Sequence, residues 1–328
     1  MVASETSIEA VDFFGQPAWR LVAPGGASAL IAERGATLLS WQPTPGAEVI
    51  DGYADADELA ARTDHADARS LIMAPWCGRL SHGSYRFDGE RYTVAPDEIA
   101  AWPDRVAGLD FVREAAGDAL LLRAVLPSVE GYPWELAVTV VFSLEGGAEG
   151  LEHLSLSIEV LNLSEETAPV AIGWLPYVKM PGVEGISNLS LSIPARSKIL
   201  TDSRQIPLNG DAALAGIAAP ARYDYLGHQK IDQSYSNLVP NEDGVVVTSV
   251  TNPVRGTQVL LTQEPSEAPV MHVYTGDAVA RRPRGSIALG PYSELPDAFN
   301  RADAASRIPL LAGDTRSLTV TLSYRGVR

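Results

Sequence analysis

The side chains of this sequence that can carry a proton or bind a metal are spread along the chain and form no local motif. No two of the five histidines stand at i, i+2 or i, i+4, the spacings that share one face of a strand or helix. The histidines are His65, His82, His153, His228 and His272. The single cysteine, Cys77, excludes an intramolecular disulfide and a cysteine-rich zinc cluster. The nucleotide, zinc-protease and serine-hydrolase signatures are also absent, so we expect neither a metal nor a cofactor.

His272 has the most informative context, because it alternates with Met271 and Val273 on a predicted strand. A lone histidine in such a strand is most often a hydrogen-bonded core residue. If it faces a pocket instead, it can act as an acid or a base, since histidine changes its charge near neutral pH. Both interpretations stay open at this point.

Two further charged residues have the chemistry of ligand binding. Arg79 follows Cys77 and Gly78 in a predicted loop, and its guanidinium can donate a fork of hydrogen bonds to hydroxyl groups or to an oxyanion. The alternative is a structural arginine bonded to loop carbonyls. Asp232 can accept a hydrogen bond from a ligand or orient His272, and its alternative is a solvated turn aspartate.

These residues must be positioned by strands, because alternation of apolar and polar residues dominates the sequence. Strands are predicted at residues 120–126, 135–144, 154–162, 189–193, 244–250, 257–262, 270–275 and 317–324. One short helix is predicted at residues 55–62, with Asp55 as its cap, and residues 209–220 are predicted to form a loop. The pattern indicates an all-β chain of antiparallel sheets, organised as one domain over residues 1–328.

The amino-acid composition limits the kinds of molecule that this protein is expected to bind. Hydrophobic residues make up 46% of the chain, and the formal net charge is −16. Such an acidic chain is repelled by nucleic acids and by anionic membranes, so we expect neither as a partner. The N-terminus has no basic, apolar signal sequence, and no apolar run approaches a membrane span, which favours a cytoplasmic protein. The sequence leaves a homodimer open.

Five segments, taken in order, resemble the aldose 1-epimerase (galactose mutarotase) family. They read APWCGRLSHGSYRFDGERYTV (74–94), EGYPWELAVTVVFSL (130–144), VLNLSEETAPVAIGWLPY (160–177), VMHVYTG (270–276) and IALGPYSELPDAFN (287–300). The resemblance implies a galactose-mutarotase-like antiparallel β-supersandwich. It also implies a sugar site in which a glutamate acts as the general base and a histidine as the general acid.

The resemblance breaks down at those catalytic positions. Gly290 stands where the family has its glutamate, and Leu175 stands where it has the histidine. The second histidine, in a His-Gly pair, is missing, and Gly78 replaces the asparagine before the family arginine. Glycine and leucine cannot carry protons, so the ordinary mutarotase mechanism is lost unless other groups replace them. The two changes also predict a larger and more apolar pocket.

Other positions keep the chemistry of a ligand site. The resemblance places Arg79, Asp232 and His272 on segments that contact the sugar, and we expect these three to line one cleft. Leu175 and Gly290 should form its apolar wall. Further candidates for ligand contact, because they lie at or beside the two changed positions, are Trp174, Leu175, Tyr177, Tyr292 and Glu294.

Three functions fit these residues. The first is an isomerase-type enzyme, an isomerase, epimerase, cyclase or lyase with a rebuilt site, in which Arg79 binds, His272 transfers a proton and Asp232 orients it. Its substrate would be a carbohydrate-like or glycosylated small molecule. The second is a non-catalytic carbohydrate-binding module or sensor. The third is an aldose 1-epimerase with displaced catalytic groups. The residues specify neither the substrate nor the reaction.

Overall fold

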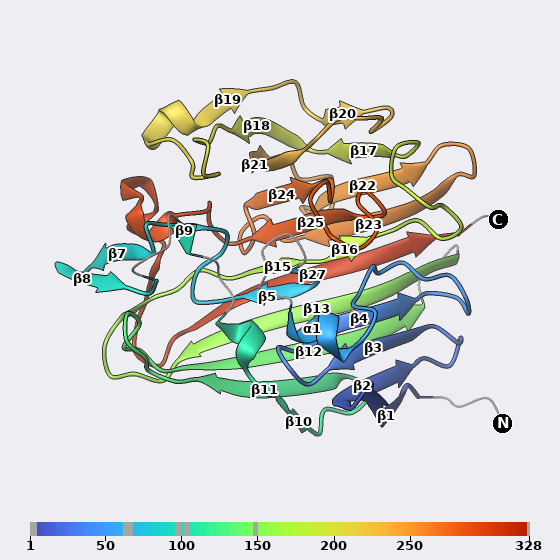
Figure 1. The fold of residues 1–328 in the computed structure, drawn as a ribbon, viewed down its shortest axis with the longest axis horizontal. Helices are drawn as coiled ribbons and strands as arrows, with labels where there is room; N and C mark the ends of the chain where they lie inside the picture. The colour runs from blue at the N-terminus through green and yellow to red at the C-terminus, as the bar shows by residue number, and fades with distance from the viewer. Residues whose placement is uncertain (1–4, 62–67, 96–99, 102–104, 147–149, 327–328) are drawn as a thin grey trace.

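The computed structural model describes residues 5–61, 68–95, 100–101, 105–146 and 150–326 (Figure 1). Strands dominate it, and they pair antiparallel in two large sheets and one smaller N-terminal sheet. The predicted all-β class is therefore confirmed. Alternation of apolar and polar residues had indicated antiparallel sheets because one face of each strand is buried and the other is wet.

The larger sheet has nine strands and holds most of the long alternating segments. Its strands, in spatial order, are β10 (Val112–Glu114), β11 (Leu120–Leu126), β12 (Leu136–Gly146), β13 (Leu151–Asn162), β27 (Thr315–Arg325), β23 (Thr257–Gln263), β22 (Val246–Asn252), β17 (Ser190–Ile193) and β20 (Ala221–Tyr223). In β13 the apolar side chains Leu154, Leu156, Ile158 and Val160 are fully buried, while the residues between them are not. Each buried side chain of this kind contributes about 1.5–3 kcal/mol to folding.

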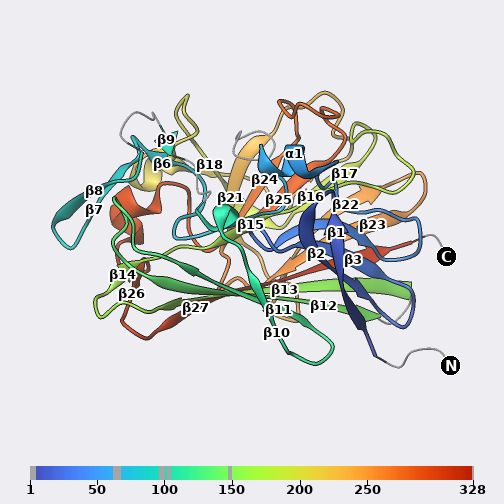
Figure 2. The same ribbon diagram turned by 60° about the horizontal axis from the view of Figure 1, so that its bottom comes forward.

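The second sheet has eight strands and lies over the first as a separate layer (Figure 2). Its strands are β19 (Leu214–Gly216), β18 (Ala195–Ile199), β21 (Asp232–Leu238), β24 (Val270–Tyr274), β25 (Ile287–Tyr292), β15 (Gly173–Leu175) and β5 (Leu71–Met73), with β16 (Tyr177–Val178) also paired to β25. Strands β25, β15 and β5 are buried on both faces, so their sequences show no alternation. Strands β15, β16, β21, β24 and β25 of this sheet carry the candidate site.

Smaller elements complete the described chain. The N-terminal sheet runs β1 (Ser7–Phe13), β2 (Gln16–Val22), β3 (Ser28–Ala32) and β4 (Thr37–Gln42). The two-stranded sheets are β6 (Leu80–Ser81) with β9 (Ala100–Ala101), β7 (Ser84–Phe87) with β8 (Glu90–Thr93), and β14 (Ala168–Pro169) with β26 (Pro309–Leu310). Short 3-10 helices span Val106–Gly108, Gly210–Ala213, Ala298–Asn300 and Ala302–Ala304.

The helix α1 (Ala56–Ala60) begins after Asp55, as predicted from the sequence. The Asp55 carboxylate accepts a hydrogen bond from the backbone N–H of Glu58 at 2.8 Å, which satisfies one of the free donors of the first turn. Residue 62, the predicted end, lies outside the described residues. The predicted loop at residues 209–220 is wrong in part, because it contains the 3-10 helix 210–213 and strand β19. No helix in the described ranges is long and apolar enough to cross a membrane.

Candidate functional site

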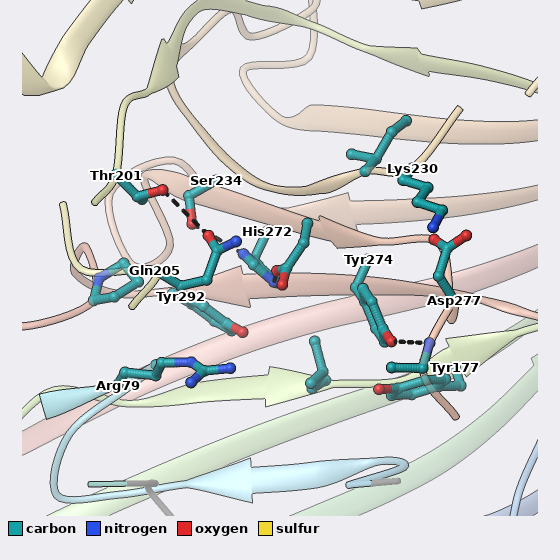
Figure 3. Close-up of a pocket in the computed structure, with 16 residues that line it drawn as sticks. Arg79, Tyr177, Thr201, Gln205, Lys230, Ser234, His272, Tyr274, Asp277 and Tyr292 are labelled. Atoms are coloured by element: carbon teal, nitrogen blue, oxygen red, sulfur yellow. Dashed lines mark hydrogen bonds and ion pairs between the residues drawn. The ribbon is translucent and has the colours of Figure 1, made fainter. Parts of the chain in front are cut away.

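A cavity of about 510 Å³ lies against the middle strands of the eight-stranded sheet (Figure 3). Its sheet-borne lining comes from β15, β16, β21, β24 and β25 and consists of Leu175, Tyr177, Asp232, Ser234, His272, Tyr274 and Tyr292. Loops add Arg79, Thr201 and Gln205 toward one end, and Lys230 and Asp277 toward the other. Strands therefore fix the reactive groups, and loops enclose them.

His272 occupies the centre of this arrangement and contacts two side chains of β21. Its Nδ1 lies 3.0 Å from Ser234 Oγ, and its Nε2 lies 3.3 Å from Asp232 Oδ1. Because an ionised carboxylate can only accept, Nε2 carries the hydrogen, and Nδ1 of a neutral ring then accepts from the Ser234 hydroxyl. The side chain is 17% exposed and lines the cavity, so His272 is a cavity residue and not a core histidine.

Asp232 faces the cavity more openly than His272, with 39% of its side chain exposed. Burial alone would raise the pKa of this carboxyl, but the hydrogen bond and charge of His272, together with the charge of Arg79, hold its pKa below the ordinary value. The Asp232 side chain is therefore a carboxylate at neutral pH, available as an acceptor.

Arg79 reaches the same cavity from the loop between β5 and β6. Its backbone carbonyl accepts a hydrogen bond from the N–H of Asp297 at 2.8 Å, which anchors the loop, and its guanidinium extends along the cavity beside Tyr292 (Figure 3). Arg79, Asp232 and His272 thus line the same cavity, and they are close enough for the charges of Arg79 and His272 to act on Asp232.

Tyr292 lies with its ring parallel to that of His272, the centroids 5.6 Å apart and the planes inclined by 10°. A methyl group added to Gly290 would lie 2.8 Å from its Cε1, and one added to Gly173 would lie 2.7 Å from its Cδ1. The ring therefore packs directly on two glycines. The missing side chain at residue 290 leaves no empty volume there, and Gly290, expected in the apolar wall, is not among the lining residues.

The remaining candidates divide between the cavity and the interior. Leu175 and Tyr177 line the cavity. Trp174 does not, because neighbouring residues of a strand point to opposite faces, and its side chain is fully buried. Glu294 also lies outside the lining and is buried, with its two carboxylate oxygens each 2.7 Å from a nitrogen of Arg307.

Two of the cavity residues that were not predicted from the sequence are Ser234, on a strand, and Gln205, in a loop. Ser234 follows Asp232 by two residues on β21, so strand alternation alone could have found it. Gln205 lies in a loop that is held by Asp202, whose carboxylate accepts the backbone N–H groups of Arg204 and Ile206. Gln205 has a φ of 64°, a left-handed conformation that is uncommon outside glycine, and no sequence signal indicates it.

A buried ion-pair cluster supports the cavity behind Tyr177. The guanidinium of Arg69 lies 5.8 Å from the centre of the Tyr177 ring, and its Nε lies 3.4 Å from Asp51 Oδ2. Asp51 also meets Arg281 at 3.3 Å, and Glu58 of α1 lies 2.9 Å from the Nε of Arg281. These contacts tie α1 to the loop that carries Asp277. Within the described ranges, no group of acidic, histidine or cysteine side chains is suited to a metal.

Comparison with known proteins shows which family the chain belongs to. The sequence model of the family described as aldose 1-epimerase matches residues 17–323. The chain belongs to the aldose 1-epimerase family. The uncharacterized protein YihR of Escherichia coli K12 is 25% identical over 240 residues, which cover 70% of this chain and 71% of YihR.

Solved structures of aldose 1-epimerase homologues share the fold. A GalM/aldose epimerase homologue from C. elegans superimposes with a TM-score of 0.77 at 14% identity, covering 98% of this chain and 100% of that one. Galactose 1-epimerase from Lactobacillus acidophilus gives 0.77 at 14%, covering 99% and 100%. A galactose mutarotase-like protein from Clostridium acetobutylicum gives 0.76 at 15%, also covering 99% and 100%. The predicted family and mutarotase-like fold are confirmed.

Proposed function

We propose that this aldose 1-epimerase family protein binds a carbohydrate-like small molecule in the cavity and acts on it as an isomerase-type enzyme with a rebuilt site. The observation that carries this proposal is the contact of Asp232 with His272 beside Arg79. A carboxylate paired with an imidazole can take up and return a proton, and a nearby guanidinium can stabilise negative charge on an oxygen.

Each of the three residues has a distinct task in this proposal. His272 transfers the proton, and Asp232 orients its ring and accepts a hydrogen bond from a ligand hydroxyl. Ser234 fixes the other ring nitrogen through its hydroxyl group. Arg79 holds and polarises a ligand oxygen. Leu175 and Tyr177 provide apolar and aromatic surface, which suits a ligand less polar than a free hexose.

A non-catalytic binding module is the second candidate, and one observation favours it. Both nitrogens of His272 are engaged inside the protein, Nδ1 with Ser234 and Nε2 with Asp232. An imidazole bonded in this way can hold a carboxylate in place without transferring a proton. The two candidates differ in what happens when the side chain at position 272 can no longer transfer a proton.

Three variants and a control separate the candidates. Ligands would be sought by calorimetry in a panel of monosaccharides, methyl glycosides, uronic acids and sugar lactones, and every binder would be followed by NMR for conversion. For an enzyme, His272→Gln should keep binding and lower turnover by about 100-fold or more. Arg79→Ala should weaken binding by about 10- to 100-fold, because a charge-assisted contact is lost.

The matched control is Arg123→Ala, which removes an exposed arginine paired with Glu114 on β10 of the nine-stranded sheet. It should change neither binding nor turnover. If the wild type binds a ligand but does not convert it, the enzyme is excluded and the binding module remains. No binding by any member of the panel, or binding that Arg79→Ala and Asp232→Asn leave intact, would reject this site for carbohydrate-like ligands.

We expect the protein to act in the cytoplasm.

A further inference from the structure

The ring of Tyr292 is tightly packed in the cavity wall, and the proposed function gives its hydroxyl group no task. Its ring packs on Gly173 and Gly290, where added methyl groups would come within 2.7 Å and 2.8 Å of it. The opposite support is the ring of His272, stacked at 5.6 Å. Only 3% of the residue is exposed. A side chain held this way presents its terminal atom at a fixed point.

That terminal atom faces the cavity. Figure 3 shows the hydroxyl of Tyr292 directed into the open space beside the guanidinium of Arg79. No side chain or backbone group in the described ranges forms a hydrogen bond with it. The hydroxyl of the buried Tyr132, by contrast, donates to the carbonyl of Pro169 at 2.9 Å. A fixed hydroxyl group without a protein partner, directed into a cavity, points to a ligand atom.

The protonation state of Tyr292 decides what it offers a ligand. Burial raises the pKa of its phenol well above the ordinary value, and the negative charge of Asp232 acts in the same direction. The phenol therefore stays neutral and keeps its hydrogen. On the same side of the cavity Arg79 can only donate, and the Gln205 side-chain carbonyl already accepts from the Thr201 hydroxyl at 3.2 Å.

We propose that the Tyr292 hydroxyl donates a hydrogen bond to an unprotonated oxygen of the ligand, and that the site therefore selects molecules with a carbonyl oxygen at this point. This inference rests on the proposed carbohydrate-like ligand. A carbonyl oxygen accepts from both Tyr292 and Arg79. A hydroxyl group in the same place brings a hydrogen of its own. Whether it donates to the phenol oxygen or accepts from it, one of the two hydroxyl hydrogens is left without an acceptor at Tyr292 and Arg79.

Two sugars that differ at one carbon test the selection. D-galactose carries a hydroxyl at C1, and freshly dissolved D-galactono-1,5-lactone carries a carbonyl there. In the wild type the lactone should bind about 10-fold more tightly, as measured by calorimetry. Tyr292→Phe keeps the ring, the glycine contacts and the stacking, but removes the donor, so the preference should disappear.

Tyr132→Phe is the matched control, because it removes a buried hydroxyl outside the cavity. It should keep the lactone preference but lower the midpoint of urea unfolding, since the Pro169 carbonyl loses its donor. Tyr292→Phe should leave that midpoint unchanged. A lowered midpoint would overturn the inference by showing an internal partner, and so would equal binding of the two sugars to the wild type. If neither these two sugars nor any other member of the panel binds, the proposed function fails and the inference fails with it.

Discussion

Gly290 and His272 face each other directly across strands β25 and β24, and the glycine lets the ring of Tyr292 lie flat against the histidine. The resemblance to the aldose 1-epimerase family assigns a glutamate to the position of Gly290. In this chain an aromatic ring occupies that space, and a neutral phenol hydroxyl stands on the same wall as a charged arginine.

Enlarging Gly290 should destabilise the protein. In Gly290→Ala the new methyl group would lie 2.8 Å from Tyr292 and 3.0 Å from Leu175, both of which are buried. Such overpacking costs about 1–3 kcal/mol of unfolding free energy, measurable by urea denaturation. Gly216→Ala is the control, because a methyl group at that strand position meets nothing within 4 Å. An equal effect of the two substitutions would contradict this account.

The protein should not speed the interconversion of α- and β-galactose. Mutarotation needs one group that takes a proton and another that protonates the ring oxygen, and neither Gly290 nor Leu175 can do so. Polarimetry with purified protein should show the uncatalysed rate. Gly290→Glu should not restore activity, because the Tyr292 ring obstructs the added side chain. Catalysis at the rate of an ordinary mutarotase would mean that other groups have taken over.

Asp232 should make stability depend on pH in the acid range. Burial opposes its ionisation, but His272 and Arg79 lower its pKa below that of the unfolded chain. Its stabilising contribution is therefore complete above about pH 4, the unfolded pKa, and is lost as the pH falls through the lower folded value. The unfolding free energy of the wild type should drop more steeply below pH 4 than that of Asp232→Asn. Parallel curves would show that this carboxyl gains nothing on folding.

Removing Asp51 should be far more damaging than removing an exposed acid. Asp51→Ala takes a carboxylate from Arg69, whose side chain is completely buried, and should lower the unfolding free energy by about 3 kcal/mol. Asp110→Ala breaks a single exposed pair with Arg34 and should cost less than about 1 kcal/mol. Chemical denaturation of both variants measures the difference, and similar values would argue against a structural role for the buried cluster.

Cys77 should be inert in the folded protein. Burial raises the pKa of its thiol to about 12, and its Sγ lies 3.1 Å from the carbonyl of Glu294, to which it donates. Because only the thiolate reacts readily, iodoacetamide at pH 8 should label Cys77 in urea but not in buffer. Rapid labelling of the folded protein would show that the buried segment around Cys77 opens.

The long strands could be predicted from the sequence because each has one wet face. Strand β11 has the predicted bounds, and β13 only begins three residues earlier than expected. Strand β24, which carries His272, also lies where it was predicted and ends one residue earlier than expected. Two other strands of the site are different. Strands β15 and β16 are two or three residues long and fully buried, so neither length nor alternation marks them. Their positions depend on pairing with β25, which is a property of the folded chain.

The site shows the same limit at the level of single residues. The family resemblance indicated Arg79, Asp232 and His272, and the structure brings them to one cavity. The resemblance could not show that the side chain of Trp174 points to the interior, because the register of a three-residue strand decides which of two neighbouring residues faces the cavity. Nor could it show that Glu294 is already engaged, because its partner Arg307 is distant in the sequence and is brought close only by the fold.

The packing of Tyr292 on Gly173 and Gly290 also limits the order in which this site can evolve. A carboxylate at position 290 is tolerated only after the ring at position 292 has gone, and the ring fits only while both glycines remain. The effect of each substitution thus depends on the others, which is epistasis with a physical cause. Any route between this site and one with a glutamate at position 290 should pass through a chain with a small residue at position 292, which leaves His272 without its stacking partner.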